Sequence, residues 1–199
     1  MYGFSGITDV NDGFLSMSLQ RGGEARFYNE LAEIQVSDTD IVVISYSDGD
    51  VAQLEKKGGN IVLFSPNASR VNYLVFNTNT AKTGGYGVEV YNSRGQVVFS
   101  SNHKFLRPTK LVDTNLNRGF FSENSPYGKK YGVIVSNYGF RIDISPEHCR
   151  KVMRSVKVDN SQVIFNSVNH DNRGAGRIPV TFTDNTFFAN AIIVDITGY

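Results

Sequence analysis

Short apolar or alternating runs recur along the whole sequence, and each is bounded by Gly, Asn, Asp or Ser. Turn signals at intervals of roughly 8–12 residues are typical of strands in a β-sandwich or barrel. Gly and Asn supply turns because they tolerate positive φ, while aromatic and β-branched residues favour strands. The sequence therefore predicts an all-β fold, an antiparallel β-sandwich of jelly-roll or Ig-like type, with at most one or two short helices.

The predicted strands are the apolar or alternating runs themselves. They cover Phe14–Leu19, Glu33–Val36, Ile41–Tyr46, Ile61–Phe64, Val71–Phe76, Gly87–Tyr91, Gln96–Ser100, Tyr131–Ser136, Phe140–Ile144, Ser155–Val158, Val163–Val168, Ile178–Phe182 and Ala191–Ile196.

Two pairs of these runs are predicted to form hairpins. In Gly87–Ser101 two strands flank an Asn-Ser-Arg-Gly turn, in which Gly95 is expected to adopt positive φ. The second hairpin is expected to join Tyr131–Asn137 to Phe140–Ser145, with little more than Tyr-Gly between them.

Helix signals are few. Ser-Pro-Glu at 145–147 is an N-cap pattern followed by proline at the first helical position, and it predicts one or two turns over Pro146–Met153. Another single turn is expected within Ala25–Ala32.

The chain length of 199 residues predicts a single β-sandwich domain over residues 1–199. Thr78–Gly85 is polar, small and glycine-ended, so it is the stretch most similar to a linker. It leaves open a division into an N-terminal and a C-terminal β unit near residues 78–85.

Charge and hydropathy exclude several partners. Lys and Arg total 20 against 19 Asp and Glu, and this balance argues against nucleic acid, whose phosphates require a basic excess. No run approaches the ~20 apolar residues of a spanning helix, so membrane insertion is not expected. The first residues carry neither a basic nor an apolar stretch, which predicts synthesis in a cytoplasm without a signal peptide.

The residues that usually carry catalysis or bind metals form no motif. A single cysteine, Cys149, excludes an intramolecular disulfide, and its neighbour His148 is no catalytic partner because such pairs meet across space. His103 and His170 are not spaced as metal ligands either. The sequence therefore predicts no catalytic, cofactor-binding or metal-binding residues, and no enzyme.

Two loops are candidate protein-contact surfaces, because loops between strands often carry recognition. The first contains Arg173 and Arg177 in a polar, glycine-rich stretch, and arginine is favoured at interfaces. The second runs from Phe120 to Tyr127 and also contains Phe121.

The stretch Val71–Asp113 carries a more specific pattern. A strand ending in Val75-Phe76 precedes a glycine linker, then Tyr-Gly-Val-Glu-Val-Tyr-Asn at 86–92, a turn with Gly95, and Val-Val-Phe-Ser-Ser at 97–101. This pattern resembles a segment of small structural proteins of long-tailed bacteriophages, encoded near tail-tip and tail-fibre genes. Ser100 stands where those proteins usually have Asp.

The resemblance implies a non-enzymatic virion component, synthesised in the host cytoplasm. It would join or decorate the distal tail or tail tip, or hold receptor-binding fibres. Its expected partners are other tail proteins and further copies of itself. Two alternatives remain open: a receptor- or glycan-binding module that contacts the bacterial surface, and an enzyme such as a glycan hydrolase.

Overall fold

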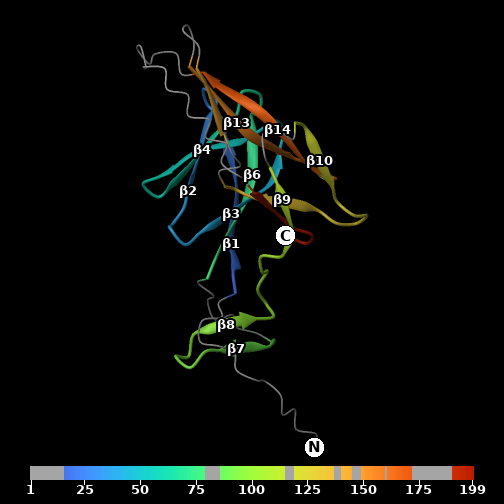
Figure 1. Cartoon of the computed structure of the whole chain (residues 1–199). Helices are drawn as coiled ribbons and strands as arrows, with labels where there is room; N and C mark the ends of the chain where they lie inside the picture. The colour runs from blue at the N-terminus through green and yellow to red at the C-terminus, as the bar shows by residue number, and fades with distance from the viewer. Residues whose placement is uncertain are drawn as a thin grey trace, which may run out of the picture.

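The computed structural model describes residues 16–78, 86–114, 119–136, 140–144, 149–159, 161–171 and 190–199. These residues form strands, turns and irregular segments, with no helix among them. The predicted all-β class is confirmed. The strands make antiparallel sheets that face each other in a sandwich, with a small hairpin, β7–β8, beyond one end of it (Figure 1).

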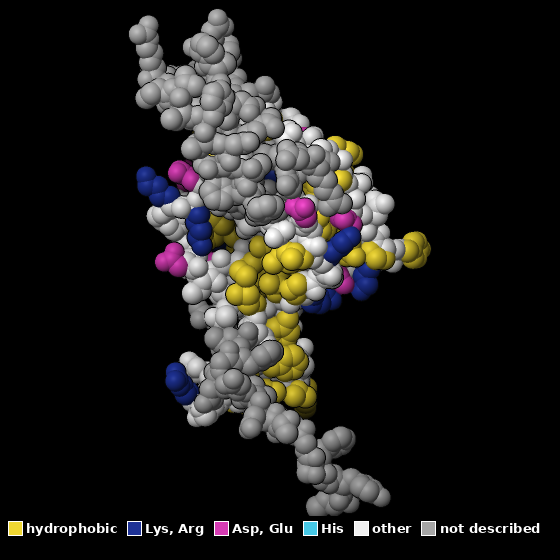
Figure 2. All heavy atoms as spheres, in the orientation of Figure 1, with side chains coloured by type: hydrophobic (Ala, Val, Ile, Leu, Met, Phe, Trp, Pro, Cys, Tyr) yellow, Lys and Arg dark blue, Asp and Glu magenta, His cyan; other side chains and the backbone are white. Residues whose placement is uncertain are grey.

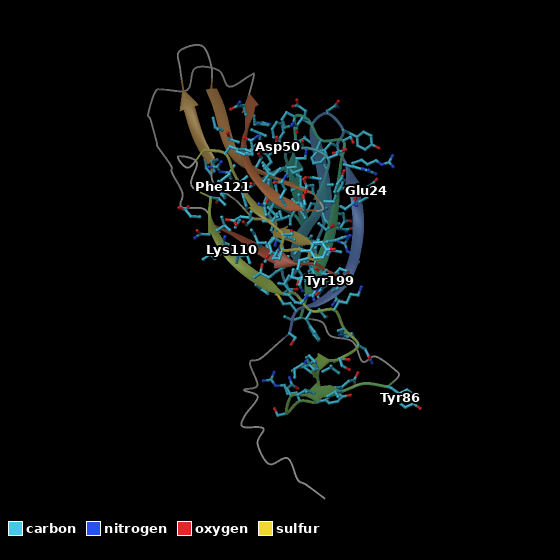
Figure 3. All side chains as sticks on the ribbon, turned by 90° about the vertical axis from the view of Figure 1, so that its right-hand side faces the viewer. Glu24, Asp50, Tyr86, Lys110, Phe121 and Tyr199 are labelled. Atoms are coloured by element: carbon cyan, nitrogen blue, oxygen red, sulfur yellow. The ribbon has the colours of Figure 1, made fainter. Side chains whose placement is uncertain are left out.

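One layer is a six-stranded sheet in which all neighbours are antiparallel. Its strands, in spatial order, are β1 (Ser18–Arg26), β6 (Arg70–Asn77), β3 (Ile41–Ser47), β11 (Tyr131–Ile134), β15 (Asn190–Asp195) and β9 (Pro108–Asp113). Strands from both sides of residues 78–85 therefore share this sheet. Its edge strands β1 and β9 lie on opposite sides of the molecule, where Glu24 and Lys110 are labelled in Figure 3.

The other layer contains two smaller sheets. The first orders β2 (Leu31–Gln35), β5 (Asn60–Phe64) and β4 (Ala52–Lys57), and the second orders β10 (Phe121–Asn124), β14 (Gln162–Asp171), β13 (Cys149–Val158) and β12 (Phe140–Ile144). Val51, just before β4, exchanges two backbone hydrogen bonds of 2.8 Å with Val156 of β13. This bridge joins the two smaller sheets.

The main core lies between the two layers, because alternate residues of each strand point inward. The chain repeatedly crosses from one layer to the other, from β1 to β2, from β3 to β4 and from β9 to β10. Both layers therefore contribute to one buried cluster. Its members are Ala25, Ala32, Ile34, Val36, Val42, Ile44, Val51, Ile61, Leu63, Val71, Val75, Val112, Val133, Val135, Val156, Val158, Val163, Phe165, Ala191 and Ile193.

A second apolar cluster covers the outer face of the six-stranded sheet. Val43, Phe76 and Val194 alternate with core residues on their strands, and Ile196 packs over them. Gly132 allows this packing, since a Cβ there would lie 2.7 Å from Val43 Cγ1 and 3.2 Å from Ile196 Cγ2. Figure 2 shows hydrophobic side chains gathered level with the C-terminus and continuing toward the β7–β8 hairpin.

The segment after β15 is held by an ionic cluster centred on Asp195. Its carboxylate accepts a hydrogen bond of 2.8 Å from the Thr197 amide and lies 3.0 Å from Lys129 Nζ and 3.7 Å from an Arg107 nitrogen. Burial by itself would raise the pKa of Asp195, but the hydrogen bonds from Thr197 and Lys129 and the charge of Arg107 outweigh it and lower the pKa to about 2.

The predicted hairpin within Gly87–Ser101 is confirmed. β7 (Glu89–Tyr91) pairs with β8 (Val97–Ser100), and Gly95 has a φ of 74°. Asn92 closes the turn, because its Oδ1 accepts hydrogen bonds of 3.0 Å from the amides of Arg94 and Gln96.

Both helix predictions are wrong. Cys149–Met153 belongs to β13, and Pro146 lies outside the described residues. Residues 152–156 are buried without interruption, because β13 lies between β12 and β14 and is covered on both faces. Ala25–Ala32 instead holds a tight turn between β1 and β2, in which the backbones of Tyr28 and Leu31 exchange two hydrogen bonds.

The second predicted hairpin is also wrong. β11 pairs with β3 and β15 in the six-stranded sheet, whereas β12 pairs with β13 in the other layer. Three strands were missed, namely β4, β9 and β10, because their sequences are largely polar and carry little apolar alternation. The predicted strand Ile178–Phe182 lies outside the described residues.

We expect Gly95→Val to destabilise the β7–β8 hairpin by about 1 kcal/mol, because a β-branched residue is strained at positive φ. Gly95→Asn is the matched control, since asparagine tolerates this conformation. Amide hydrogen exchange at Asn92, whose N–H donates to the Gln96 carbonyl, reports the opening of the turn. Equal exchange in the valine variant and the wild type would contradict the prediction.

Asp195 should make stability depend on acid. A pKa lowered from 3.8 to about 2 contributes stability that is present above about pH 4 and is lost as the pH falls toward 2. We expect Asp195→Asn to cost about 1 kcal/mol at neutral pH, after allowance for solvent screening, and progressively less on acidification. Urea unfolding across this pH range, with the exposed Asp38→Asn as control, measures the effect. A pH-independent difference would disprove it.

Candidate interaction surfaces

The predicted contact loop at 120–127 contains residues with different environments. Phe121 lies in β10 opposite Phe165 of β14, and the two rings stack with centroids 4.8 Å apart and planes at 15°. Phe120 is 67% exposed, and Tyr127 is fully exposed. Phe121 therefore packs within the fold, while Phe120 and Tyr127 are open to a partner.

A buried arginine positions the start of the loop at 120–127. Arg154 is only 2% exposed, and its guanidinium donates to the carbonyls of Thr114 at 3.0 Å, Gly119 at 2.8 Å and Asn166 at 3.2 Å. These bonds offset the cost of burying the charge. Since Gly119 immediately precedes Phe120, Arg154 fixes where the exposed ring leaves the sandwich.

The loop at 120–127 ends in a tight turn. The Lys129 amide donates to the Pro126 carbonyl at 2.9 Å, and Gly128 has a φ of 73°. These values match a turn that requires positive φ at its third residue. The Ser125 amide also donates to the Ser161 carbonyl at 2.7 Å, which ties the turn to the segment before β14. Tyr127 thus stands at the tip of an anchored turn.

An apolar pair lies on the outer face of the neighbouring sheet edge. Leu111 of β9 is opposite Ile192 of β15, and both side chains are exposed. Lys110 Nζ lies 2.7 Å from Glu123 Oε2, and this ion pair ties the edge strand β9 to β10 of the other layer. The pair of Leu111 and Ile192 was not predicted from the sequence, because β9 was not recognised as a strand.

The β7–β8 hairpin carries a second exposed surface. Tyr86 is fully exposed and points away from the sandwich, as Figure 3 shows, and Val88 and Tyr91 are exposed beside it. On the hairpin's other strand, Phe99 stacks on Phe105 with centroids 5.0 Å apart. The sequence predicted the hairpin itself but not a role for these exposed residues. The tyrosines at 86 and 91, on either side of the alternating stretch Gly-Val-Glu-Val, were the available signal.

The remaining predicted site residues are less informative. Arg173 and Arg177 lie outside the described residues, as does His148. Within the described ranges, no three His, Cys, Asp or Glu side chains come together as a metal site would require. No helix among the same residues is long and apolar enough to cross a membrane.

Comparison with known proteins places the chain in a family. A model described as "Family of unknown function (DUF6453)" matches residues 36–169, about two-thirds of the sequence, and the chain belongs to this family. The matched region begins just after β2 and includes β3 to β13 and most of β14, so it contains the β7–β8 hairpin and most of the sandwich but not β1, β2 or β15. Neither a curated protein nor a solved structure gives a significant match to this chain.

We expect Phe120 and Phe121 to differ sharply on mutation. Phe121→Ala should cost about 3 kcal/mol of unfolding free energy, because it leaves a space against Phe165. Phe120→Ala should change stability by less than about 0.5 kcal/mol, because its ring is exposed. Chemical denaturation of both variants measures the contrast. Similar losses for the two variants would show that the environments are wrongly assigned.

Proposed function

We propose that this protein is a non-enzymatic structural component of a bacteriophage tail, which joins or decorates the distal tail or holds its fibres. The observation that carries the proposal is the β7–β8 hairpin. This hairpin is the central part of the segment that resembles phage tail proteins, and it lies beyond the sandwich, where Tyr86, Val88 and Tyr91 are exposed. A projecting hairpin with exposed aromatic residues is suited to docking on a neighbouring subunit.

The chemistry of the exposed residues supports a protein partner. Tyrosine is enriched at protein interfaces because it buries a large apolar area and retains a hydroxyl for hydrogen bonding. Tyr91 uses this hydroxyl within the hairpin, where it donates to the Glu89 carboxylate, and this hydrogen bond raises the pKa of Tyr91. Its ring remains partly exposed beside Tyr86.

The sandwich offers a second region for contact with neighbouring copies or other tail proteins. Phe120, Tyr127, Leu111 and Ile192 lie on or beside β9 and β10, which are edge strands in the described sheets. Edge strands and exposed apolar side chains are features through which β proteins associate. Two contact regions, one on the hairpin and one on the sandwich, would let a single subunit connect two neighbours.

A receptor- or glycan-binding module is the alternative. It is favoured by the β10 turn, by which we mean β10 and the turn that follows it, residues 120–129. There, exposed Phe120 and Tyr127 flank a strand that ends in Glu123 and Asn124. Rings beside carboxylate and amide groups are suited to stacking on sugars and bonding to their hydroxyls.

The test compares how much of the wild-type and variant protein is present in purified phage tails. We expect Tyr86→Ser combined with Tyr91→Ser to reduce incorporation of the protein into tails at least tenfold, while the purified variant stays folded. Tyr28→Ser is the matched control, because Tyr28 is equally an exposed tyrosine but lies on the β1–β2 turn of the sandwich. Arg173→Ala with Arg177→Ala is a second variant, expected to weaken incorporation without unfolding.

Three outcomes would contradict parts of the proposal. A protein that is strictly monomeric and missing from purified tails would overturn the assembly role. Normal incorporation of the double tyrosine variant would remove the hairpin from it, and normal incorporation without both arginines would remove that loop. Phage that assemble normally but lose attachment to cells would favour the receptor-binding alternative.

A further inference from the structure

A hollow of about 400 Å³ lies on the outer face of the six-stranded sheet. Four separate parts of the chain meet there: β3, β6, the residue before β11 and the segment after β15. Its lining consists of Ser45, Tyr46, Asn72, Leu74, Lys130, Ile196 and Tyr199. This volume is within the usual range for small-molecule sites, roughly 300–1,000 Å³.

A β-bulge concentrates polar groups in this hollow. The pairing of β3 with β6 shifts between Ile44 and Tyr46, so Ser45 is an extra residue without a direct partner. As a result, Ser45 and Tyr46 both line the outer hollow although they are consecutive. Bulges of this kind re-aim side chains and are common beside functional sites.

The hollow contains an unsatisfied hydrogen-bonding group. Asn72 Oδ1 is buried, and it has no hydrogen-bond partner among the described residues. A buried polar atom without a partner is unfavourable, and turning the amide toward the hollow would let a ligand supply the missing hydrogen bond. Because an asparagine amide can be turned over, the group offers a ligand an acceptor or a donor at this point.

Several cationic side chains lie near the residues that line the hollow. Lys130 is exposed at the rim, and it forms no ion pair with any described residue. Arg70 lies 5.8 Å from the ring centre of Tyr46, and Lys104 and Arg107 lie 5.5 Å and 4.7 Å from that of Tyr199. Arg70 lies 3.5 Å from a Glu24 carboxylate oxygen, and Arg107 and Lys129 are both paired with Asp195. Lys130 is therefore the residue of the lining whose charge is available to a ligand.

The lining therefore combines three kinds of contact. Leu74, Ile196 and the Tyr46 ring offer apolar surface, Ser45 and Asn72 offer hydrogen bonds, and Lys130 offers a positive charge. A sugar ring has an apolar C–H face together with hydroxyl donors and acceptors, and an acidic sugar adds a carboxylate that can pair with an ammonium group. We propose that this hollow binds an acidic monosaccharide unit, either a uronic acid or a sialic acid, as part of a surface glycan.

This site is separate from the proposed assembly surfaces, because its lining includes no residue of the β7–β8 hairpin or the β10 turn. Failure of the tail-incorporation experiment would therefore leave it standing, and the reverse also holds. It places glycan binding on the outer sheet face and not on the β10 turn.

The test titrates the full chain with methyl α-D-glucuronide, N-acetylneuraminic acid and methyl α-D-glucoside, followed by chemical-shift changes in the protein. The glucoside is a matched neutral probe, because it differs from the glucuronide only in having a hydroxymethyl group in place of the carboxylate. We expect at least one acidic sugar to bind with shifts at Tyr46, Asn72 and Lys130, and to bind about tenfold more tightly than the neutral glucoside.

Variants then localise the interaction. Lys130→Met should weaken binding of the acidic sugar about tenfold and leave the weak neutral binding unchanged. Asn72→Leu should weaken both sugars, because it removes the hydrogen-bonding group while keeping a similar volume. Lys57→Met, at the exposed lysine that ends β4, is the control and should bind as the wild type does.

Each variant is shown to be folded when the amide chemical shifts of residues away from the hollow match those of the wild type. Absence of binding by either acidic sugar would overturn the proposal. Binding of neither acidic sugar more tightly than the glucoside, or acidic-sugar binding that Lys130→Met and Asn72→Leu leave unchanged, would also overturn it.

Discussion

The backbone bridge between Val51 and Val156 is the constraint on which the rest of the sandwich depends. Both residues are completely buried, and their two hydrogen bonds join the sheet of β2, β5 and β4 to the sheet of β10, β14, β13 and β12. Buried peptide groups must be paired, and this bridge pairs the Val51 and Val156 peptides where the two sheets meet. Together they make one layer broad enough to face the six-stranded sheet and cover its core.

Polar side chains secure the ends of this sandwich, where the strand pairing stops. Asp48 accepts hydrogen bonds from the amides of Ser69 and Arg70 and from the Ser69 hydroxyl, which ties the β3–β4 turn to the segment before β6. Burial alone would raise the pKa of Asp48, but these hydrogen bonds lower it below its usual value. Arg154 donates hydrogen bonds to the carbonyls of Thr114, just after β9, and Gly119, just before β10. Turns held like this present their exposed side chains in defined positions, which recognition requires.

The exposed features of the molecule lie in three separate places. The β7–β8 hairpin and the β10 turn carry exposed aromatic residues suited to protein contacts, whereas the hollow on the outer sheet face combines apolar, hydrogen-bonding and cationic groups. The separation has a structural origin. The segment after β15 folds back over the outer sheet face and forms one wall of the hollow, with Asp195 and Arg107 holding it there. Assembly and ligand binding can therefore coexist on one subunit without sharing residues.

The all-β class, most of the apolar strands and the turn at Gly95 could be predicted from the sequence, because strand alternation and positive φ are local properties of the chain. Which strands pair depends on the packing of the whole chain. β11 and β12 are neighbours in sequence but belong to different layers, and the polar strands β4, β9 and β10 form because existing sheet edges offer their backbones hydrogen bonds. A helix was wrongly predicted to include Cys149–Met153 for the same reason, since pairing with β12 and β14 outweighs a local helix signal. The hollow could not be predicted at all, because four distant parts of the chain meet there only after the two layers have packed.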